Sequence, residues 1–165
     1  MDEQRIIQEL KNNSDRSIND IADKCGFSRQ KVWRIIKRLK KNKTIWGYSA
    51  IVDEEKIGRK YYILLLKRNV KPIESGPLKN IISREIEGHI KKLGCEMMSS
   101  LYTQGEYDWV IIFTAPDKIH AKKVNELFIT RYHEFLTEVN LVETIFPVEI
   151  QGFVNPDIKK LEQIF

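Results

Sequence analysis

The 165-residue sequence predicts an α+β fold in two parts, a small helical domain followed by a larger domain in which strands and helices alternate. Three observations support this. Helical patterns punctuated by a glycine open the chain. A charged stretch without apolar runs follows them. Beyond it, apolar strand-like runs alternate with amphipathic helical stripes in the order β-α-β-β-α-β. That order is ferredoxin-like, with helices expected on one face of an antiparallel sheet.

Composition places the chain among ordinary globular proteins. Apolar residues make up 42% and charged residues 31% of the sequence. No apolar run approaches the roughly 20 residues that span a bilayer, and the first residues lack the layout of a signal peptide. Cys25 and Cys95 are too few for a disulfide framework, and no Cys/His spacing is typical of zinc. We therefore expect a cytoplasmic protein with reduced thiols and no membrane partner, metal or cofactor.

Three helices are predicted at the start of the chain. The first covers residues 2–12, and residues 17–43 contain two more around a tight corner. Ser17 and Asp20 have the spacing of a capping box, and Gly26 supplies the left-handed position at which a helix ends. The predicted inward-facing residues are Ile6, Ile7, Leu10, Ile18, Ile21, Ala22, Val32, Ile35, Ile36 and Leu39.

The third of these helices is basic. Residues 24–52 contain nine lysines and arginines and no acidic residue. Residues 1–59 hold 14 basic against 9 acidic residues, a net charge of +5, whereas residues 60–165 hold 14 of each. A merely solvated helix usually mixes both signs to gain i,i+4 pairs, so DNA binding by a helix-turn-helix is the favoured interpretation. The predicted DNA-binding residues are Ser28, Arg29, Gln30, Lys31, Trp33, Arg34, Lys37, Arg38 and Lys41.

These residues have different expected roles. Gln30, Arg34 and Lys37 are expected to reach base edges or nearby phosphates, and the remaining cations mostly phosphate. For Trp33 two roles stay open, stacking near sugar or base edges and contact with another subunit. Residues 44–52 are strand-like around Gly47 and predict a small ribbon, the wing of a winged helix-turn-helix. At least one of its two large aromatic side chains, Trp46 and Tyr48, is expected to pack against the helices.

The predicted domains are therefore a winged helix-turn-helix over residues 1–52, a charged linker over 53–60 and a ferredoxin-like domain over 61–165. In the last domain, strands are predicted at 61–70, 95–103, 107–115 and 138–154, with helices at 77–93, after Pro116 and at 156–165. The first and third strands are apolar on both faces, which requires a second covering layer. Since the chain has no spare layer, we predict a homodimer through this sheet.

Several motifs occur in a specific order along the chain. They are D-x-x-x-I from Asp2 to Ile6, R-S-I-N-D-I-A at 16–22, G-F-S at 26–28, V-W-R-I-I-K-R-L at 32–39, I-W-G-Y-S-A-I-V-D at 45–53, I-G at 57–58 and G-E-Y-D at 105–108. In these motifs the chain resembles the Lrp/AsnC, or feast/famine, family of transcriptional regulators over about residues 1–154. The resemblance implies a DNA-binding domain followed by a ligand-sensing domain. It also implies dimers, larger assemblies that are commonly octamers, and a response to amino acids or related small molecules.

The resemblance further implies an effector site between dimers, near the loop Thr103–Asp108. Its expected residues here are Thr103, Gly105, Glu106, Tyr107 and Asp108. Gly105 would allow a turn that a Cβ would obstruct, and Asp108 would contact an amine. In the alternative interpretation Gly105 only makes a hairpin and Asp108 only caps it. This chain also departs from the family pattern in a longer first regulatory helix with an insertion before it, and around Asn140 and Leu141.

The leading functional hypothesis is a sequence-specific DNA-binding transcriptional regulator that responds to an amino acid or related molecule. One alternative is an enzyme, because the siroheme decarboxylases share the two-domain architecture. That chemistry needs His or Arg groups for tetrapyrrole carboxylates, and His89, His120 and His133 share no motif. Another alternative is an architectural protein that binds DNA with little specificity. No nucleophile–base pair, acidic dyad or phosphate-binding loop is evident, so the sequence predicts no enzyme.

Overall fold

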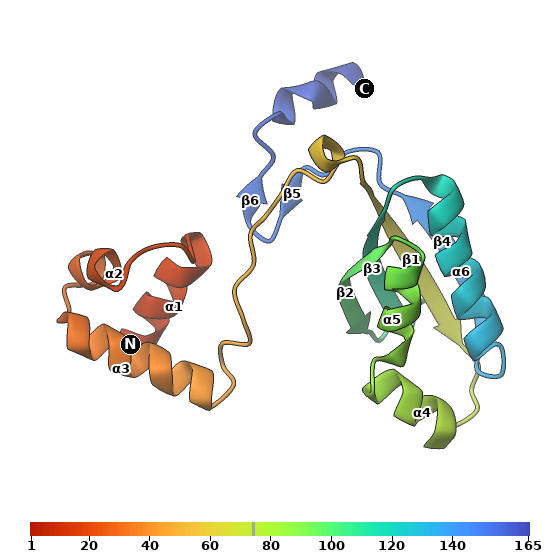
Figure 1. Cartoon of the computed structure of the whole chain (residues 1–165), viewed down its shortest axis with the longest axis horizontal. Helices are drawn as coiled ribbons and strands as arrows, with labels where there is room; N and C mark the ends of the chain where they lie inside the picture. Colours follow the sequence, from red (N-terminus) through yellow and green to blue (C-terminus); the bar gives the residue numbers. More distant parts are fainter. Residues whose placement is uncertain (74) are drawn as a thin grey trace. The chain divides into compact units, whose positions relative to one another are not determined.

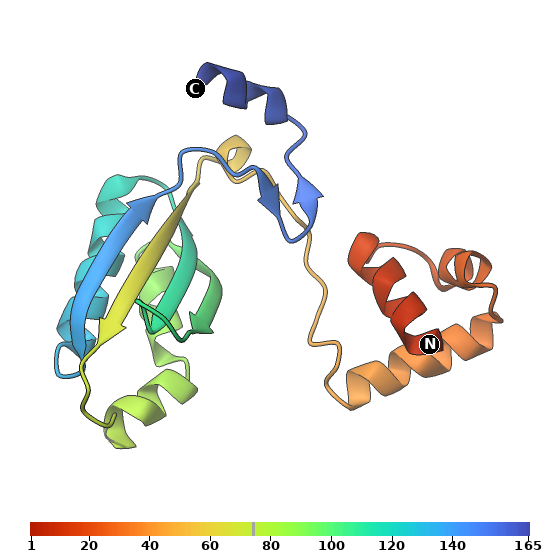
Figure 2. The same cartoon turned by 180° about the vertical axis from the view of Figure 1, so that it is seen from behind.

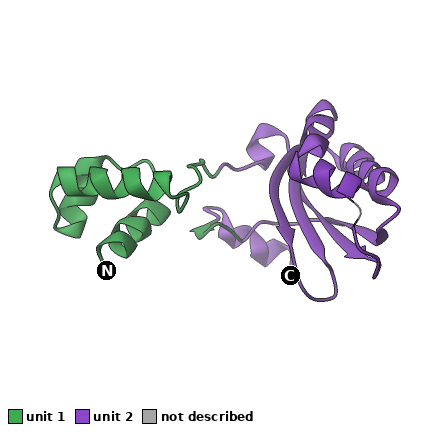
Figure 3. Cartoon of the chain, turned by 90° about the horizontal axis from the view of Figure 1, so that it is seen from below, with its two compact units in different colours: residues 1–51, 149–154 green, residues 52–148, 155–165 purple. Residues whose placement is uncertain are grey.

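A computed structural model describes residues 1–73 and 75–165, and it divides the chain into two compact units (Figure 3). Unit 1 comprises Met1–Ile51 with Glu149–Val154, and unit 2 comprises Val52–Val148 with Asn155–Phe165. Within the described part of the chain, no helix combines the length and the apolar character that crossing a membrane demands. Each unit has its own apolar core.

Unit 1 is built on α1 (Asp2–Asn12), α2 (Ile18–Cys25) and α3 (Arg29–Lys41), which lie within a residue of their predicted positions (Figure 1). Their predicted apolar stripes meet in one core, as the hydrophobic spacing requires. Cys25 is buried there as well, and Phe27 packs against the core at the corner between α2 and α3. The buried core residues are Ile6, Leu10, Ile21, Ala22, Cys25, Val32, Ile35 and Leu39.

The ribbon predicted within residues 44–52 does not form, because residues 45–53 have no regular secondary structure. Only Ile45 continues the helical core, and its amide donates to the Leu39 carbonyl at 3.1 Å. Trp46 is 95% exposed and does not pack against the helices. Tyr48 is 45% exposed and lies outside the core, where its ring contacts Lys40 of α3, so of the two aromatic side chains only Tyr48 meets a helix among the described residues. The physical reason that the ribbon does not form is that an isolated ribbon is marginal without a surface on which to pack.

A short ribbon does occur later in the chain. Strands β5 (Glu149–Ile150) and β6 (Phe153–Val154) pair antiparallel around a turn in which Gln151 and Gly152 both have positive φ. The strand or strand pair predicted over 138–154 is therefore split, as the Pro147 interruption indicates. The predicted terminal helix is a 3₁₀ helix, η2 (Ile158–Gln163).

Unit 2 contains a four-stranded antiparallel sheet in the order β2-β3-β1-β4. Its helices lie on one face, which leaves the other face open in Figure 2. This is the predicted β-α-β-β-α-β arrangement, with the first crossover made by two helices. The elements are η1 (Glu55–Ile57), β1 (Lys60–Arg68), α4 (Ser75–Ile82), α5 (Glu85–Lys92), β2 (Glu96–Tyr102), β3 (Trp109–Ala115), α6 (Lys118–Tyr132) and β4 (Leu136–Glu143).

The single helix predicted over 77–93 is wrong, since α4 ends at Ile82 and α5 begins at Glu85. Arg84, between them, has a φ of 59°, in the left-handed region that breaks a helix. Its guanidinium pairs with Glu87 in the first turn of α5. The apolar spacing continues across the break, so periodicity alone does not reveal it.

The two sheet faces differ in how they are covered. Toward the helices, Trp109 packs between Phe128 and Tyr132, with ring centroids 5.6 and 5.7 Å away. On the other face, Ile63 of β1 pairs with Ile112 of β3, and both side chains are only partly buried. Leu101 on β2 is 53% exposed. The sheet is thus apolar on both faces, as predicted, but only one face is covered within the chain.

Candidate nucleic-acid interface

The corner before α3 is fixed by local hydrogen bonds. The Ser17 side chain accepts from the Asp20 amide, and the Asp20 carboxylate accepts from Ser17, which completes a capping box at α2. Gly26 ends α2 with φ 66° and ψ 37°, where a side chain would be strained. The Phe27 amide then donates to the Ala22 carbonyl at 2.9 Å. These contacts determine where α3 begins.

Ser28 has a structural role in addition to its predicted DNA contact. Its hydroxyl is the N-cap of α3 and accepts from the Lys31 amide at 3.3 Å. The first turn of α3 contains no acidic residue, and its last turn contains three cations. Cations at a helix C-terminus are favoured by the helix dipole. The dipole therefore favours the cations of the last turn of α3, but not Arg29 and Lys31 in its first turn.

One side of α3 presents polar and cationic groups to solvent. Gln30, Arg34, Lys37 and Lys41 are exposed there, as is Arg29. The Arg34 Nε donates to the backbone carbonyl of Gln30 at 3.4 Å, which holds the Arg34 side chain against the preceding turn of the helix. This side of α3 carries no acid and can therefore approach phosphate without repulsion.

Trp33 lies on the same exposed side, and it is 49% exposed. The Lys37 ammonium lies 4.7 Å from the centroid of its ring, a cation–π contact. The ring is thus held beside a cation and keeps part of its surface available for stacking. Lys40 makes a similar contact with the Tyr48 ring, also at 4.7 Å.

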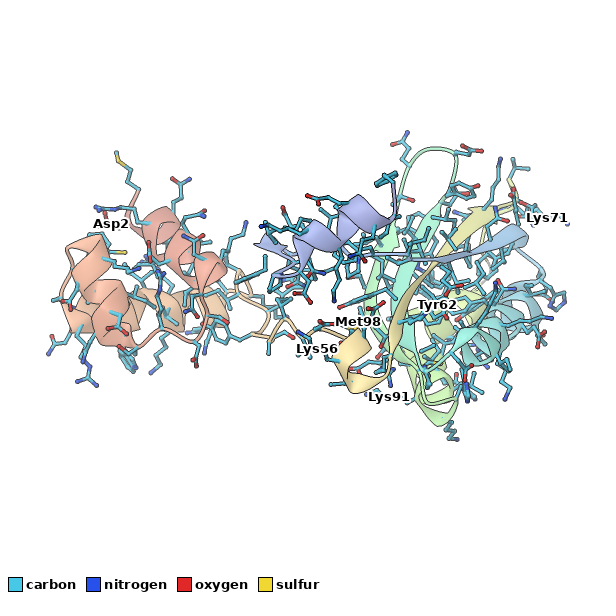
Figure 4. All side chains as sticks on the ribbon, turned by 90° about the horizontal axis from the view of Figure 1, so that it is seen from above. Asp2, Lys56, Tyr62, Lys71, Lys91 and Met98 are labelled. Carbon is cyan, nitrogen blue, oxygen red and sulfur yellow. The ribbon has the colours of Figure 1, made fainter. Side chains whose placement is uncertain are left out.

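The two remaining predicted DNA-binding residues form ion pairs with α1. The Lys31 ammonium lies 2.6 Å from Asp2 Oδ2, and Arg38 Nη2 lies 2.7 Å from Glu3 Oε1. The hydrogen bond from Lys31 lowers the pKa of the Asp2 carboxyl (Asp2 is labelled in Figure 4). All four side chains are substantially exposed, so these pairs are open to exchange with other ions. Sequence patterns identify the acids at the start of α1 only as favourable to the helix dipole.

The predicted effector loop is a tight connection between β2 and β3. The Thr103 amide donates to the Asp108 carbonyl at 2.8 Å, and its hydroxyl donates to the Tyr107 carbonyl at 2.7 Å. Asp108 Oδ2 accepts from the Arg68 amide at 2.7 Å, which ties the loop to the end of β1. Glu106 and Gly105 are exposed at the tip of the loop.

An added Cβ at Gly105 would meet no atom within 4 Å, so crowding is not what favours glycine there. Its φ of 157° is nonetheless one that residues with a Cβ rarely adopt. Asp108 accepts through one carboxylate oxygen from the end of β1 and not from the hairpin that the alternative interpretation has it cap. The Tyr107 hydroxyl accepts from Asn140 on β4 at 3.2 Å. The loop is therefore held from two neighbouring strands.

The three histidines do not converge on one site. His89 Nδ1 contacts the Glu85 carbonyl, and His133 Nδ1 contacts the Thr130 carbonyl. Each of these carbonyls is three or four residues before its histidine in the chain. His120 Nδ1 lies 2.7 Å from the Asp117 carboxylate at the start of α6. Over residues 1–73 and 75–165, no group of three or more His, Cys, Asp and Glu side chains is placed to hold a metal ion.

This chain is similar to one protein family near its start and to individual proteins over most of its length. Residues 3–45 match the winged helix-turn-helix DNA-binding family. Over 149 residues the chain is 25% identical to the uncharacterised HTH-type transcriptional regulator PH0061 of Pyrococcus horikoshii, covering 90% of this chain and 92% of that protein. The crystal structure of PH0061 superposes with a TM-score of 0.73 at 21% identity and covers 90% of this chain and 94% of that one.

Two further crystal structures share the fold. An AsnC family transcriptional regulator from Agrobacterium tumefaciens has a TM-score of 0.67 at 17% identity, with 94% of this chain and 96% of that chain covered. The Neisseria meningitidis transcriptional regulator NMB0573, in complex with L-Met, has a TM-score of 0.67 at 13% identity, with 99% and 97% covered. The chain therefore contains a match to the winged helix-turn-helix DNA-binding family over residues 3–45 and has, over most of its length, the fold of the AsnC family transcriptional regulator and the other regulators named above.

Proposed function

We propose that this protein is a sequence-specific DNA-binding transcriptional regulator. The observation that carries the proposal is the exposed side of α3, which presents Gln30, Arg34, Lys37 and Lys41 on a helix that contains no acidic residue. A capped helix of 13 residues that follows a glycine corner has the geometry that enters a major groove. The name of the relative PH0061, an HTH-type transcriptional regulator, supports the same function.

Within this interface the residues divide by chemistry. Arg34 and Gln30 offer the fork and amide groups that read guanine and adenine edges, and Lys37 lies one turn further along the same side. Arg29 and Lys41 mark the two ends of the helix and suit phosphate contacts. Lys31 and Arg38 would contact phosphate only after exchanging their α1 carboxylates for it.

We also propose that two copies associate through the open face of the unit 2 sheet. Ile63, Leu65, Val110 and Ile112 share this face and lie side by side across β1 and β3. All four are only partly buried in the single chain, and a contiguous apolar patch of this kind marks an interaction surface. Pairing would present two α3 helices to paired half-sites. The resemblance to the Lrp/AsnC family, whose members commonly form octamers, is the basis on which we propose assembly of such dimers into octamers.

An amino-acid effector at the loop Thr103–Asp108 is the third part of the proposal. The bound L-Met of NMB0573 shows that a protein of this fold takes such a ligand. In this chain the loop has exposed backbone at Gly105, and one Asp108 oxygen receives no hydrogen bond from the described residues. We further propose a cytoplasmic location, where the buried free thiols of Cys25 and Cys95 remain reduced.

Selection of duplexes from a random-sequence library, followed by anisotropy titrations of the best duplex, tests the proposal. We expect a specific-to-nonspecific affinity ratio above about 10³. Changing Arg29, Lys37 and Lys41 together to Gln should weaken binding to every duplex so far that none is enriched. Changing Lys91, Lys122 and Lys159, three exposed lysines of unit 2, to Gln is the matched control and should leave the enrichment intact. A ratio below about 10³ would favour an architectural protein, and a spectral shift on mixing with siroheme would favour the enzyme.

A further inference from the structure

Unit 2 contains a cavity of about 550 Å³ between α4, α5 and one end of the sheet. Its volume lies in the range of small-molecule sites. None of the loop residues 103–108 lines it, so it is separate from the expected effector loop. Its walls are largely apolar and include Ile73, Ile81, Ile86, Met97, Trp109 and Phe135.

Two arginines stand among the polar residues of the cavity lining, and they differ in their pairing. The Arg84 guanidinium is neutralised by Glu87, which also lines the cavity. Arg68 donates through Nη1 to the Tyr102 hydroxyl and through Nη2 to the Lys71 carbonyl at 3.1 Å. Its Nε is buried and has no hydrogen-bond partner among the described residues. None of the carboxylates in the described segments forms an ion pair with Arg68, so its positive charge is available to a ligand.

The other polar groups of the lining also offer donors. The Ser100 hydroxyl accepts from Trp109 Nε1 at 2.8 Å, which leaves its own O–H to donate. The Tyr102 hydroxyl accepts from Arg68 and is likewise left with its proton. Glu87, the acid in the lining, is engaged with Arg84. A ligand that matches this lining presents acceptors and negative charge to Arg68 and presents no ammonium group.

We propose that this cavity binds a small carboxylic acid with an apolar body and no amino group, such as a 2-oxo acid with a branched or aromatic side chain. Arg68 binds the carboxylate, Ser100 and Tyr102 donate to its oxygens, and the wall formed by Ile81, Ile86 and Phe135 receives the apolar body. Any effect of this ligand on DNA binding rests on the proposed function. Binding itself does not, because the cavity lies wholly in unit 2.

Isothermal titration of the full chain without DNA tests the site. The probes are 4-methyl-2-oxopentanoate, leucine and 4-methylpentanamide, which share one side chain and differ in their polar groups. We expect this cavity to bind the oxo acid at least about 10-fold more tightly than either of the others, since leucine brings an unpaired ammonium and the amide lacks the charge. Leucine binding that is at least as tight as oxo-acid binding and that is weakened by Ile81→Phe, or no heat with the oxo acid at millimolar concentration, overturns the proposal. Leucine binding that Ile81→Phe leaves unchanged belongs to another site, such as the proposed effector loop.

Three variants locate the binding. Arg68→Gln should weaken oxo-acid binding about 10-fold or more and leave the weak amide binding unchanged. Ile81→Phe should fill the cavity and weaken oxo-acid binding. Ile82→Phe is its matched control, because Ile82 lies on the same helix, is 70% exposed and does not line the cavity. Oxo-acid binding that ignores Ile81→Phe rejects this cavity. These titrations contain no DNA, so their results do not depend on whether the protein binds DNA.

Discussion

The Lys31 ammonium of α3 lies 2.6 Å from the Asp2 carboxylate of α1, so this carboxylate competes with DNA phosphate for Lys31. Asp2→Asn should release Lys31 and remove one negative charge beside the interface. We expect tighter binding to a nonspecific duplex at low salt and a salt slope steeper by about one unit. Anisotropy titrations between about 50 and 200 mM salt measure both quantities.

Asp15→Asn is the matched control for this change, because it removes the same charge from an exposed loop where no ion pair is formed among the residues described. Its salt slope should equal that of the unchanged protein. If both variants raised the affinity equally, general charge rather than release of Lys31 would be responsible, and Lys31 would not lie at the phosphate backbone.

Arg34 and Lys41 should respond differently to truncation, because they are proposed to contact different parts of DNA. Arg34→Ala should cost about 1–3 kcal/mol on the selected duplex and relax specificity at one base pair. Lys41→Ala should weaken all sequences alike and flatten the salt slope by about one unit. Competition titrations against single-base-pair variants of the duplex separate the two patterns. Identical patterns for both variants would show that the orientation of α3 in the groove is different.

The open sheet face predicts the effect of a buried charge. Ile112 pairs with Ile63 on β1 and Ser99 on β2 at the centre of this face. Ile112→Lys should place an unpaired ammonium in the proposed dimer interface and weaken association by about 3 kcal/mol or more. Sedimentation velocity should then show monomers at micromolar protein. Ile129→Lys, on the exposed side of α6, is the control and should remain dimeric. If the Ile112→Lys protein were also dimeric, the dimer interface would lie elsewhere.

Sequence periodicity predicted those parts of the fold that depend on local spacing. The stripes of α1 and α3 converge with Ile6 and Val32 fully buried, because helix period alone determines which side chains share a face. It could not reveal the break at Arg84, since Ile82 and Ile86 continue the i,i+4 spacing through it. The backbone there turns because of a single left-handed residue.

The candidate sites were predictable to different degrees. The basic side of α3 follows from composition and helical period, so its exposed residues could be named from the sequence. The Arg38–Glu3 pair joins residues 35 positions apart, and no local pattern indicates such a pair. The cavity beside Arg68 depends likewise on the packing of α4 over the sheet, a tertiary property.

Arg59 predicts a stability change that depends on pH. Its guanidinium donates to the Thr114 hydroxyl at 2.9 Å and to the Thr114 and Gly94 carbonyls at 3.0 and 3.1 Å, and it lies 3.6 Å from Glu54 Oε2. Glu54 is only 8% exposed, and burial raises the pKa of its carboxyl while Arg59 opposes that rise. Arg59→Met should therefore raise this pKa further and destabilise unit 2 by about 3 kcal/mol at neutral pH.

The direction of the pH dependence follows from that raised pKa. In Arg59→Met the folded state binds the Glu54 proton more tightly than the unfolded state, whose pKa is near the ordinary 4.5. The electrostatic part of the loss is thus fully present above the folded pKa and fades as the pH falls through it toward 4.5. Urea denaturation followed by Trp109 fluorescence, with Trp33 and Trp46 changed to Phe, measures it. Lys56→Met is the control, because it removes only an exposed pair with Asp53 and should lower the free energy of unfolding by less than about 1 kcal/mol at every pH. If the stability loss in Arg59→Met did not vary with pH, Glu54 would not be the group left unpaired.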